Sequence, residues 1–137
     1  MAERLPLVDT NLLIRHLRQD HPEQSPRASA YLGRIESGEL LAQTNLLVIS
    51  ETVYVLQSFY KLTKPDIAGM LVPIIALSNL KIPKKVQLRR TFDWYVRYNL
   101  SFVDAYLAVL TRQQRLPGLV SFDRNYDRVP GVRRVEP

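Results

Sequence analysis

Apolar residues recur every three or four positions along most of this chain, which is the spacing of amphipathic helices. The pattern predicts six helices, over residues 11–17, 22–37, 46–60, 63–77, 84–99 and 101–116. Gly38 supplies a stop for the second helix. The segment 46–60 is nearly all apolar, and its length favours a buried helix over two strands. Helices therefore account for most of the expected structure.

Short apolar runs lie between these helices and predict strands. The runs cover residues 5–8, 40–44, 80–83, 118–122 and 132–135, and residues 123–130 are typical of a turn. Parallel strands need crossover connections that helices fill, so this order of elements favours an α/β fold with a parallel sheet. In such sheets ligands bind beyond the carboxyl ends of the strands, where Asp9 and Asp123 stand.

Length and composition restrict the possible classes of protein. The 137 residues suit a single domain, residues 1–137, that can bury a core without disulfides. The sequence has no cysteine and two histidines, His16 and His21, which excludes zinc fingers, thiol chemistry and histidine-rich metal sites. Any metal bound here would therefore need oxygen ligands.

The charge balance and the apolar runs indicate a partner class and a location. Nineteen Lys and Arg stand against thirteen Asp and Glu, a net charge of +6, which favours a polyanionic partner but also simply maintains solubility. The first residues do not resemble a targeting segment. The longest uncharged apolar run, residues 67–77, is well short of the roughly 20 residues of a membrane-spanning helix. We expect a cytoplasmic protein with no membrane contact.

Four acids interrupt or end apolar runs, namely Asp9, Glu51, Asp104 and Asp123. An unpaired buried carboxylate is costly, so each would have to be partnered, neutralised or bound to metal. Neither Glu51 nor Asp104 has a Lys or Arg within three or four residues. A divalent cation relieves the repulsion between converging carboxylates, and oxygen ligands select Mg²⁺ or Mn²⁺. An acidic metal pocket on a basic protein suits an enzyme that cuts phosphodiesters.

Three of these acids also have a purely local interpretation. Asp104 follows Ser101 by three residues, which is the spacing of a capping box. Asp9 could cap the first helix, and Asp123 could form an Asx turn. Glu51 has no such alternative, because it lies in mid-helix without a local partner.

Four motifs occur in order along the chain: Val8-Asp9-Thr10-Asn11, Ser50-Glu51, Ser101-Phe102-Val103-Asp104-Ala105-Tyr106-Leu107-Ala108, and Ser121-Phe122-Asp123-Arg124-Asn125-Tyr126-Asp127 followed by Pro130-Gly131-Val132. Together they resemble the PIN domain, in particular the VapC-type toxins of bacterial and archaeal toxin-antitoxin pairs. Each motif alone has little specificity, but the four in this order span essentially the whole chain.

This resemblance implies a PIN-like three-layer sandwich with a central, mostly parallel sheet of four or five strands flanked by helices. It implies a Mg²⁺- or Mn²⁺-dependent endoribonuclease that leaves a 5′-phosphate and a 3′-hydroxyl. Asp9, Glu51, Asp104 and Asp123 would be its catalytic, metal-binding acids. The resemblance also implies RNA as the substrate, a cognate antitoxin protein as a partner, and a homodimer.

Further residues take supporting parts in this interpretation. Thr10 or Asn11 would support the metal shell beside Asp9, and Ser121 stands where the family usually has threonine, which keeps the hydroxyl. Asp127 would be a further outer-shell acid or a plain turn residue. Because they flank Asp123, we expect Arg124 and Arg128 to contact the substrate.

Two other functions remain open at this point. A PIN-like module could bind RNA or protein without cutting it, although the presence of all four acids argues against this. A phosphatase or phospho-acceptor domain could use Asp9 as its nucleophile, but it usually has a second acid at the position of Asn11 and a lysine near the sheet end. No lysine follows Lys85.

Overall fold

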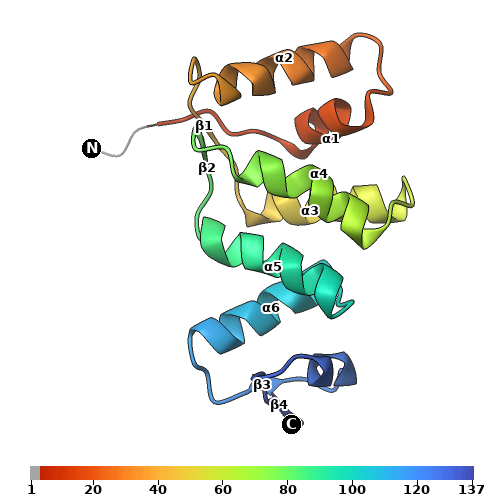
Figure 1. Ribbon diagram of the computed structural model, residues 1–137, viewed down its shortest axis with the longest axis vertical. Coiled ribbons are helices and arrows are strands. Elements are labelled where there is room, and N and C mark those ends of the chain that lie inside the picture. The colour runs from red at the N-terminus through yellow and green to blue at the C-terminus, as the bar shows by residue number, and fades with distance from the viewer. Residues whose placement is uncertain (1–3) are drawn as a thin grey trace. The chain divides into compact units, whose positions relative to one another are not determined.

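The computed structural model describes residues 4–137 and divides the chain into two compact units. The first unit ends at Pro83 and the second is Lys84–Pro137. Short strands alternate with helices in both, as the ribbon in Figure 1 shows. None of the helices in the described part is long and apolar enough to cross a membrane.

The first unit contains four α-helices and one pair of strands. The elements in chain order are α1 (Thr10–Arg18), α2 (Gln24–Glu36), β1 (Ala42–Gln43), α3 (Leu46–Ser58), α4 (Lys64–Ile75) and β2 (Leu80–Lys81). Strands β1 and β2 are parallel, with Ala42 opposite Leu80. Leu7 forms a parallel bridge to Gln43 on the other side of β1. Three chain segments thus run in the same direction in this unit.

This parallel arrangement determines where the first two helices of interest begin. The amide of Val8 donates to the carbonyl of Gln43 at 2.8 Å, and the Thr44 hydroxyl donates to the carbonyl of Val8 at 3.0 Å. Helix α1 follows Val8 directly, and α3 begins after Asn45, whose side chain accepts from the amide of Val48. Both helices therefore start at the carboxyl ends of neighbouring parallel segments.

The second unit contains two α-helices, one pair of strands and a short 3₁₀ helix. Its elements are α5 (Lys85–Arg97), α6 (Phe102–Gln113), β3 (Leu119–Val120), η1 (Arg124–Arg128) and β4 (Arg134–Val135). An aromatic cluster joins the two α-helices: the Phe102 ring centroid lies 4.9 Å from that of Phe92 and 6.0 Å from that of Tyr95. Burial raises the pKa of Tyr95 to about 12.

Strands β3 and β4 pair in parallel, with Leu119 opposite Arg134. Gly118 precedes β3, and a Cβ atom there would lie 2.6 Å from Cγ2 of Val135 and 3.1 Å from the carbonyl oxygen of Arg133. The chain is close enough to β4 at this point that only glycine avoids a clash. This pairing fixes the position of the loop that carries Asp123.

The prediction of six helices is confirmed, with ends that differ by a few residues, and so is the alternation with parallel strands. Two features differ from the prediction. The four strands form two separate two-stranded sheets, and the predicted strand 5–8 is reduced to the bridge at Leu7. Strands of two residues form few hydrogen bonds to their neighbours, so these pairs do not extend into one wider sheet. The predicted sheet of four or five strands and the three-layer sandwich are therefore supported by the PIN resemblance and not by the strand pairing.

The prediction of a helix over residues 46–60 is confirmed as α3, which is buried on one face only. Ile49, Val53 and Leu56 of α3 are buried, but Leu47 is 78% exposed and Tyr54 is 69% exposed. A helix of 13 residues has two faces, and a nearly all-apolar sequence leaves apolar residues on the outer face even when the inner one is fully packed.

Candidate functional site

Asp104 lies in the first turn of α6, where the sequence predicted a capping box. Ser101 is the N-cap residue, and its hydroxyl accepts from the amide of Asp104 at 3.1 Å. The carboxylate of Asp104 makes a different contact, because its Oδ1 accepts a hydrogen bond from the hydroxyl of Tyr126 at 2.9 Å. Serine therefore caps the helix as the local interpretation expected, while the acid itself is oriented by a residue far along the chain.

Asp123 begins the 3₁₀ helix η1 just after β3. Its amide donates to the hydroxyl of Ser121 at 2.9 Å, and its Oδ1 accepts from the amide of Asn125 at 2.9 Å. This is the Asx turn that the sequence offered as a local alternative. The turn directs the chain so that Tyr126 follows three residues later on the buried side.

Tyr126 is affected by both proposed catalytic acids of the second unit, Asp104 and Asp123. Its side chain is only 3% exposed. Burial raises the pKa of its hydroxyl far above the ordinary value, and so do the hydrogen bond to Asp104 and the negative charges of Asp104 and Asp123. Both carboxylates therefore act on the same hydroxyl. Asp104 thus contacts Tyr126 directly, and Asp123 is near enough for its charge to raise the pKa of the same hydroxyl.

Tyr126 is a residue that the sequence interpretation missed, since it was read only as one letter of the last motif. The available signal was a tyrosine, rather than a phenylalanine, in an otherwise polar turn. A buried tyrosine hydroxyl needs a hydrogen-bond partner, and an acid with no local partner was present at Asp104.

Asp9 occupies the N-cap position of α1, at the carboxyl end of the Leu7–Val8 segment. The backbone of Asp9 is extended, but its side chain makes no capping hydrogen bond. The residue is exposed, whereas Thr10 behind it is buried and 4% exposed. Asp9 therefore stands at the N-cap position that the sequence predicted, but its carboxylate does not cap the helix.

Glu51 lies on the outer face of α3. Leu47 and Tyr54, which are also exposed, are four residues before it and three after it, so the three share one face of the helix. Among the described residues no side-chain hydrogen bond or salt bridge to Glu51 is present. Its surroundings thus leave both carboxylate oxygens open to solvent.

The premise that these acids are buried was wrong. Asp9, Glu51 and Asp123 are exposed, and Asp104 is half-buried. The apolar neighbours in the sequence point elsewhere, because adjacent residues of a helix lie about 100° apart around its axis. The acids do not need a metal to relieve a burial penalty, and any role in metal binding depends on where they converge.

Oxygen ligands from carboxylates fit Mg²⁺ or Mn²⁺ in their chemistry. Within residues 4–137 no group of three or more His, Asp or Glu side chains is placed to hold a metal ion. In the second unit Asp104 is hydrogen-bonded to Tyr126 and the charge of Asp123 acts on the same hydroxyl, and Asp9 and Glu51 lie in the first unit. One site made of all four stays a prediction.

The supporting residues have defined places in the second unit. The carboxylate of Asp127 accepts from Nε of Arg134 at 3.0 Å. Nη1 of Arg128 donates to the carbonyl of Asn99 at 2.8 Å, so this guanidinium serves the turn between α5 and α6. Arg124 is exposed. The roles of these residues toward a metal or a substrate stay predictions.

The sequence model of the PIN domain family matches residues 7–132, nearly the whole chain. The chain belongs to the PIN domain family. PIN domains are generally nucleases, typically metal-dependent ribonucleases, and usually bind a divalent metal ion. A search of curated proteins found no match to this PIN domain. The family assignment confirms the resemblance at the level of the PIN domain, and the VapC-type identity goes beyond it.

Proposed function

We propose that this PIN domain is a Mg²⁺- or Mn²⁺-dependent endoribonuclease that uses Asp9, Glu51, Asp104 and Asp123. The observation that carries the proposal is the family match over residues 7–132, a span that contains all four acids. The contact of Tyr126 with Asp104 supports it, because it holds one of these carboxylates in a defined orientation while leaving its second oxygen available to a ligand.

In this proposal Asp9, Asp104 and Asp123 would hold the metal. Bound there, a divalent cation would supply activation of water and neutralisation of the phosphate charge. Glu51 would accept a hydrogen bond from the attacking water and so align it opposite the leaving oxygen. Phosphoryl transfer depends mainly on positioning and charge neutralisation, so no nucleophilic side chain is required.

The toxin role is the finer part of the proposal. A VapC-type toxin would act on cellular RNA in the cytoplasm as a homodimer and would be inhibited by a cognate antitoxin. The exposed apolar residues Leu47 and Tyr54 of α3, together with Phe59 at its C-cap, support a protein partner. A non-catalytic PIN-like module that binds RNA or protein is the alternative.

An RNA cleavage assay with Mn²⁺ tests the proposal. We expect the wild-type protein to cut single-stranded RNA, a chelator to stop it, and Asp104→Asn to lower the rate by about 100-fold or more, the scale for losing one preorganised electrostatic group. The asparagine can still accept the Tyr126 hydrogen bond, so the melting temperature should stay the same or rise.

Asp93→Asn is the matched control, because Asp93 is an exposed acid of α5 in the same unit and outside all four motifs. It should leave cleavage unchanged. Cleavage that persists in Asp104→Asn and in chelator would end the metal-dependent mechanism. A wild-type protein that binds RNA but never cuts it would favour the non-catalytic module.

A further inference from the structure

A groove of about 420 Å³ lies between α1 and α2 in the first unit. Helix α1 contributes Asn11, Leu12 and Arg15, and α2 contributes Gln24, Arg27 and Tyr31. Two of these side chains are arginines, and no acid lines the groove. The lining is therefore positively charged, with one aromatic ring, Tyr31, and two apolar residues, Leu12 and Ala28.

The two arginines of this groove differ in what they already contact. Nε of Arg15 donates to Oε1 of Gln24 at 2.8 Å, and its Nη1 lies 3.8 Å from Oδ1 of Asp20. Within the described part of the chain no hydrogen bond or salt bridge to Arg27 is present, and the residue is exposed. Arg15 thus joins the two helices, while Arg27 is available to a ligand.

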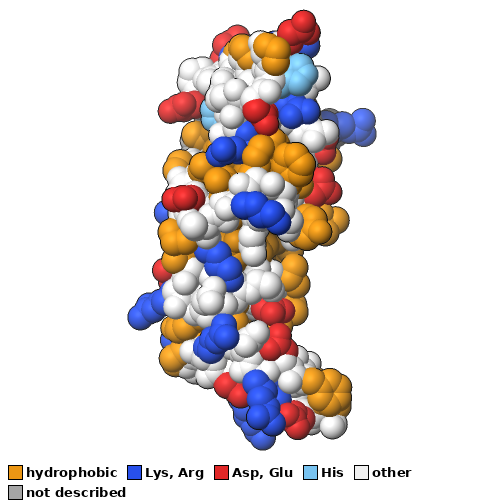
Figure 2. Space-filling view, turned by 90° about the vertical axis from the view of Figure 1, so that its right-hand side faces the viewer, with side chains coloured by type: hydrophobic (Ala, Val, Ile, Leu, Met, Phe, Trp, Pro, Cys, Tyr) orange, Lys and Arg blue, Asp and Glu red, His pale blue; other side chains and the backbone are white. Residues whose placement is uncertain are grey.

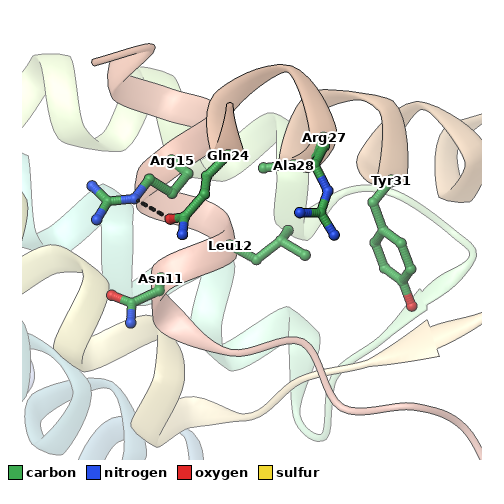
Figure 3. A pocket seen from close by; sticks show the side chains of 7 residues that line it. All are labelled: Asn11, Leu12, Arg15, Gln24, Arg27, Ala28 and Tyr31. Atoms are coloured by element: carbon green, nitrogen blue, oxygen red, sulfur yellow. Dashed lines mark hydrogen bonds between the residues drawn. The ribbon is translucent and has the colours of Figure 1, made fainter. Parts of the chain in front are cut away.

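The arrangement of the side chains suits a nucleotide. Figure 3 shows the guanidinium of Arg27 and the ring of Tyr31 both extending from α2 into the space beside Leu12 of α1. A guanidinium forms paired hydrogen bonds to phosphate oxygens, and an aromatic ring offers a stacking surface for an unpaired base. A side chain that can bind a phosphate and one that can stack on a base therefore lie in the same groove.

The groove also begins close in sequence to a proposed catalytic acid. Asn11, which lines it, follows Asp9 by two residues on the first turn of α1. On the face drawn in Figure 2, Lys and Arg side chains are spread among acidic and apolar ones and do not gather into one patch. The groove combines positive charge, an aromatic ring and proximity in sequence to Asp9.

We propose that the α1–α2 groove binds one nucleotide unit of a single-stranded RNA, with Arg27 contacting the phosphate and Tyr31 the base. This assignment rests on the proposed function, because it takes RNA as the substrate and places part of it on the helix that begins at Asp9.

Binding of a fluorescently labelled single-stranded RNA to the full chain, measured in chelator so that no cleavage occurs, tests the assignment. Arg27→Gln should weaken binding about tenfold. It should also reduce the slope of log affinity against log salt by about 0.7, the value for one lost phosphate contact on a single strand. Tyr31→Leu should weaken binding with little change in that slope, because it removes stacking and no charge.

Arg34→Gln is the matched control. Arg34 lies on the same helix and is exposed, but its Nε pairs with Glu39 at 3.1 Å and it does not line the groove. It should leave affinity and slope nearly unchanged. Equal effects of Arg27→Gln and Arg34→Gln would overturn the assignment, as would a wild-type chain that binds no RNA. Melting temperatures of all variants check that each is folded.

An oligo-glutamate peptide separates RNA from an acidic protein segment. If Arg27→Gln weakens binding of this peptide and leaves RNA binding unchanged, the groove takes acidic protein chains and our assignment fails. Failure here is also distinct from failure of the nuclease proposal. RNA binding that depends on Arg27 in a chain that never cleaves keeps the groove and removes the nuclease, and cleavage with RNA binding independent of Arg27 does the reverse.

Discussion

The two units of this PIN domain differ in how they hold the proposed catalytic acids. In the second unit Asp104 and Asp123 are held by hydrogen bonds to Tyr126, Ser121 and Asn125. In the first unit the side chain of Asp9 makes no capping bond, and Glu51 stands on an outer helix face. The carboxylates of Asp104 and Asp123 are therefore oriented by hydrogen bonds within the protein, whereas in the described part of the chain those of Asp9 and Glu51 are not.

This difference indicates which acids of the proposed site are fixed in position before a substrate binds. Catalytic groups work best when other side chains fix them before the substrate arrives. The second unit meets that requirement through Tyr126, whereas the first unit offers carboxylates with both oxygens available. Substitutions of the residues that hold Asp104, such as Ser101 and Tyr126, should therefore affect stability as well as activity, whereas substitutions at Asp9 should affect mainly activity.

Removal of the Tyr126 hydroxyl is the strongest test of this comparison. In Tyr126→Phe the carboxylate of Asp104 loses the hydrogen bond from the tyrosine hydroxyl, so we expect RNA cleavage to fall about 10- to 100-fold, the range for groups that orient metal ligands. The rise in melting temperature caused by Mn²⁺ should also become smaller. Both quantities are measured on the same preparations.

Tyr106→Phe is the control for this substitution, because Tyr106 is a partly exposed tyrosine of α6 to which no hydrogen bond is recorded in the described residues. It should preserve cleavage and the response to Mn²⁺. If both phenylalanine variants behave alike, or if only the stability of Tyr126→Phe changes, then the tyrosine is a packing residue and the comparison between the units loses its functional meaning.

Two alanine substitutions at helix N-caps compare the units in stability. Ser101→Ala removes the acceptor for the amide of Asp104 and should lower the free energy of unfolding by about 1 kcal/mol. Asp9→Ala removes no capping hydrogen bond, so its cost should stay at about 0.5 kcal/mol or less, from the helix dipole alone. Urea unfolding curves measure both, and equal costs would show that Asp9 caps α1 in solution.

The smallest expected effect concerns pH and belongs to the first unit. Burial lowers the pKa of His16, whose Nδ1 lies 2.8 Å from Oγ of Ser29. The folded protein then binds a proton less readily than the unfolded chain, so its stability should fall as the pH drops below about 6.5. The second unit contains no histidine, so a loss in this range points to the first.

Melting temperatures of the wild type and of His16→Asn across this pH range measure the contribution of His16. The asparagine variant should lose less stability on acidification. A wild type and variant with parallel pH profiles would assign the acid sensitivity to carboxylates and not to His16.

The helices of this fold were predictable because their signal is local. Apolar spacing within each segment, together with Gly38 after the second helix, gives the six α-helices to within a few residues. The sheet was less accessible, because strands of two residues carry almost no periodicity and their pairing joins distant positions such as Leu119 and Arg134.

The acids were predictable as chemistry but not in their surroundings. The Asx turn of Asp123 was predictable from the local sequence, since its hydrogen-bond partners Ser121 and Asn125 lie within two residues. The exposure of Glu51 was not, because apolar neighbours in sequence were taken for neighbours in space. The bond from Tyr126 to Asp104 spans 22 residues, and no local pattern reports such a contact.

Arg134 gives one more consequence for the loop of Asp123. Its guanidinium bonds the carboxylates of Asp127 and Glu136 and the carbonyl of Ser121, at 3.0, 2.9 and 3.2 Å. A planar fork that serves three acceptors at once is hard to replace by the point charge of lysine. Substitution of Arg134 should therefore disturb the backbone at Ser121 and, through it, the loop that carries Asp123.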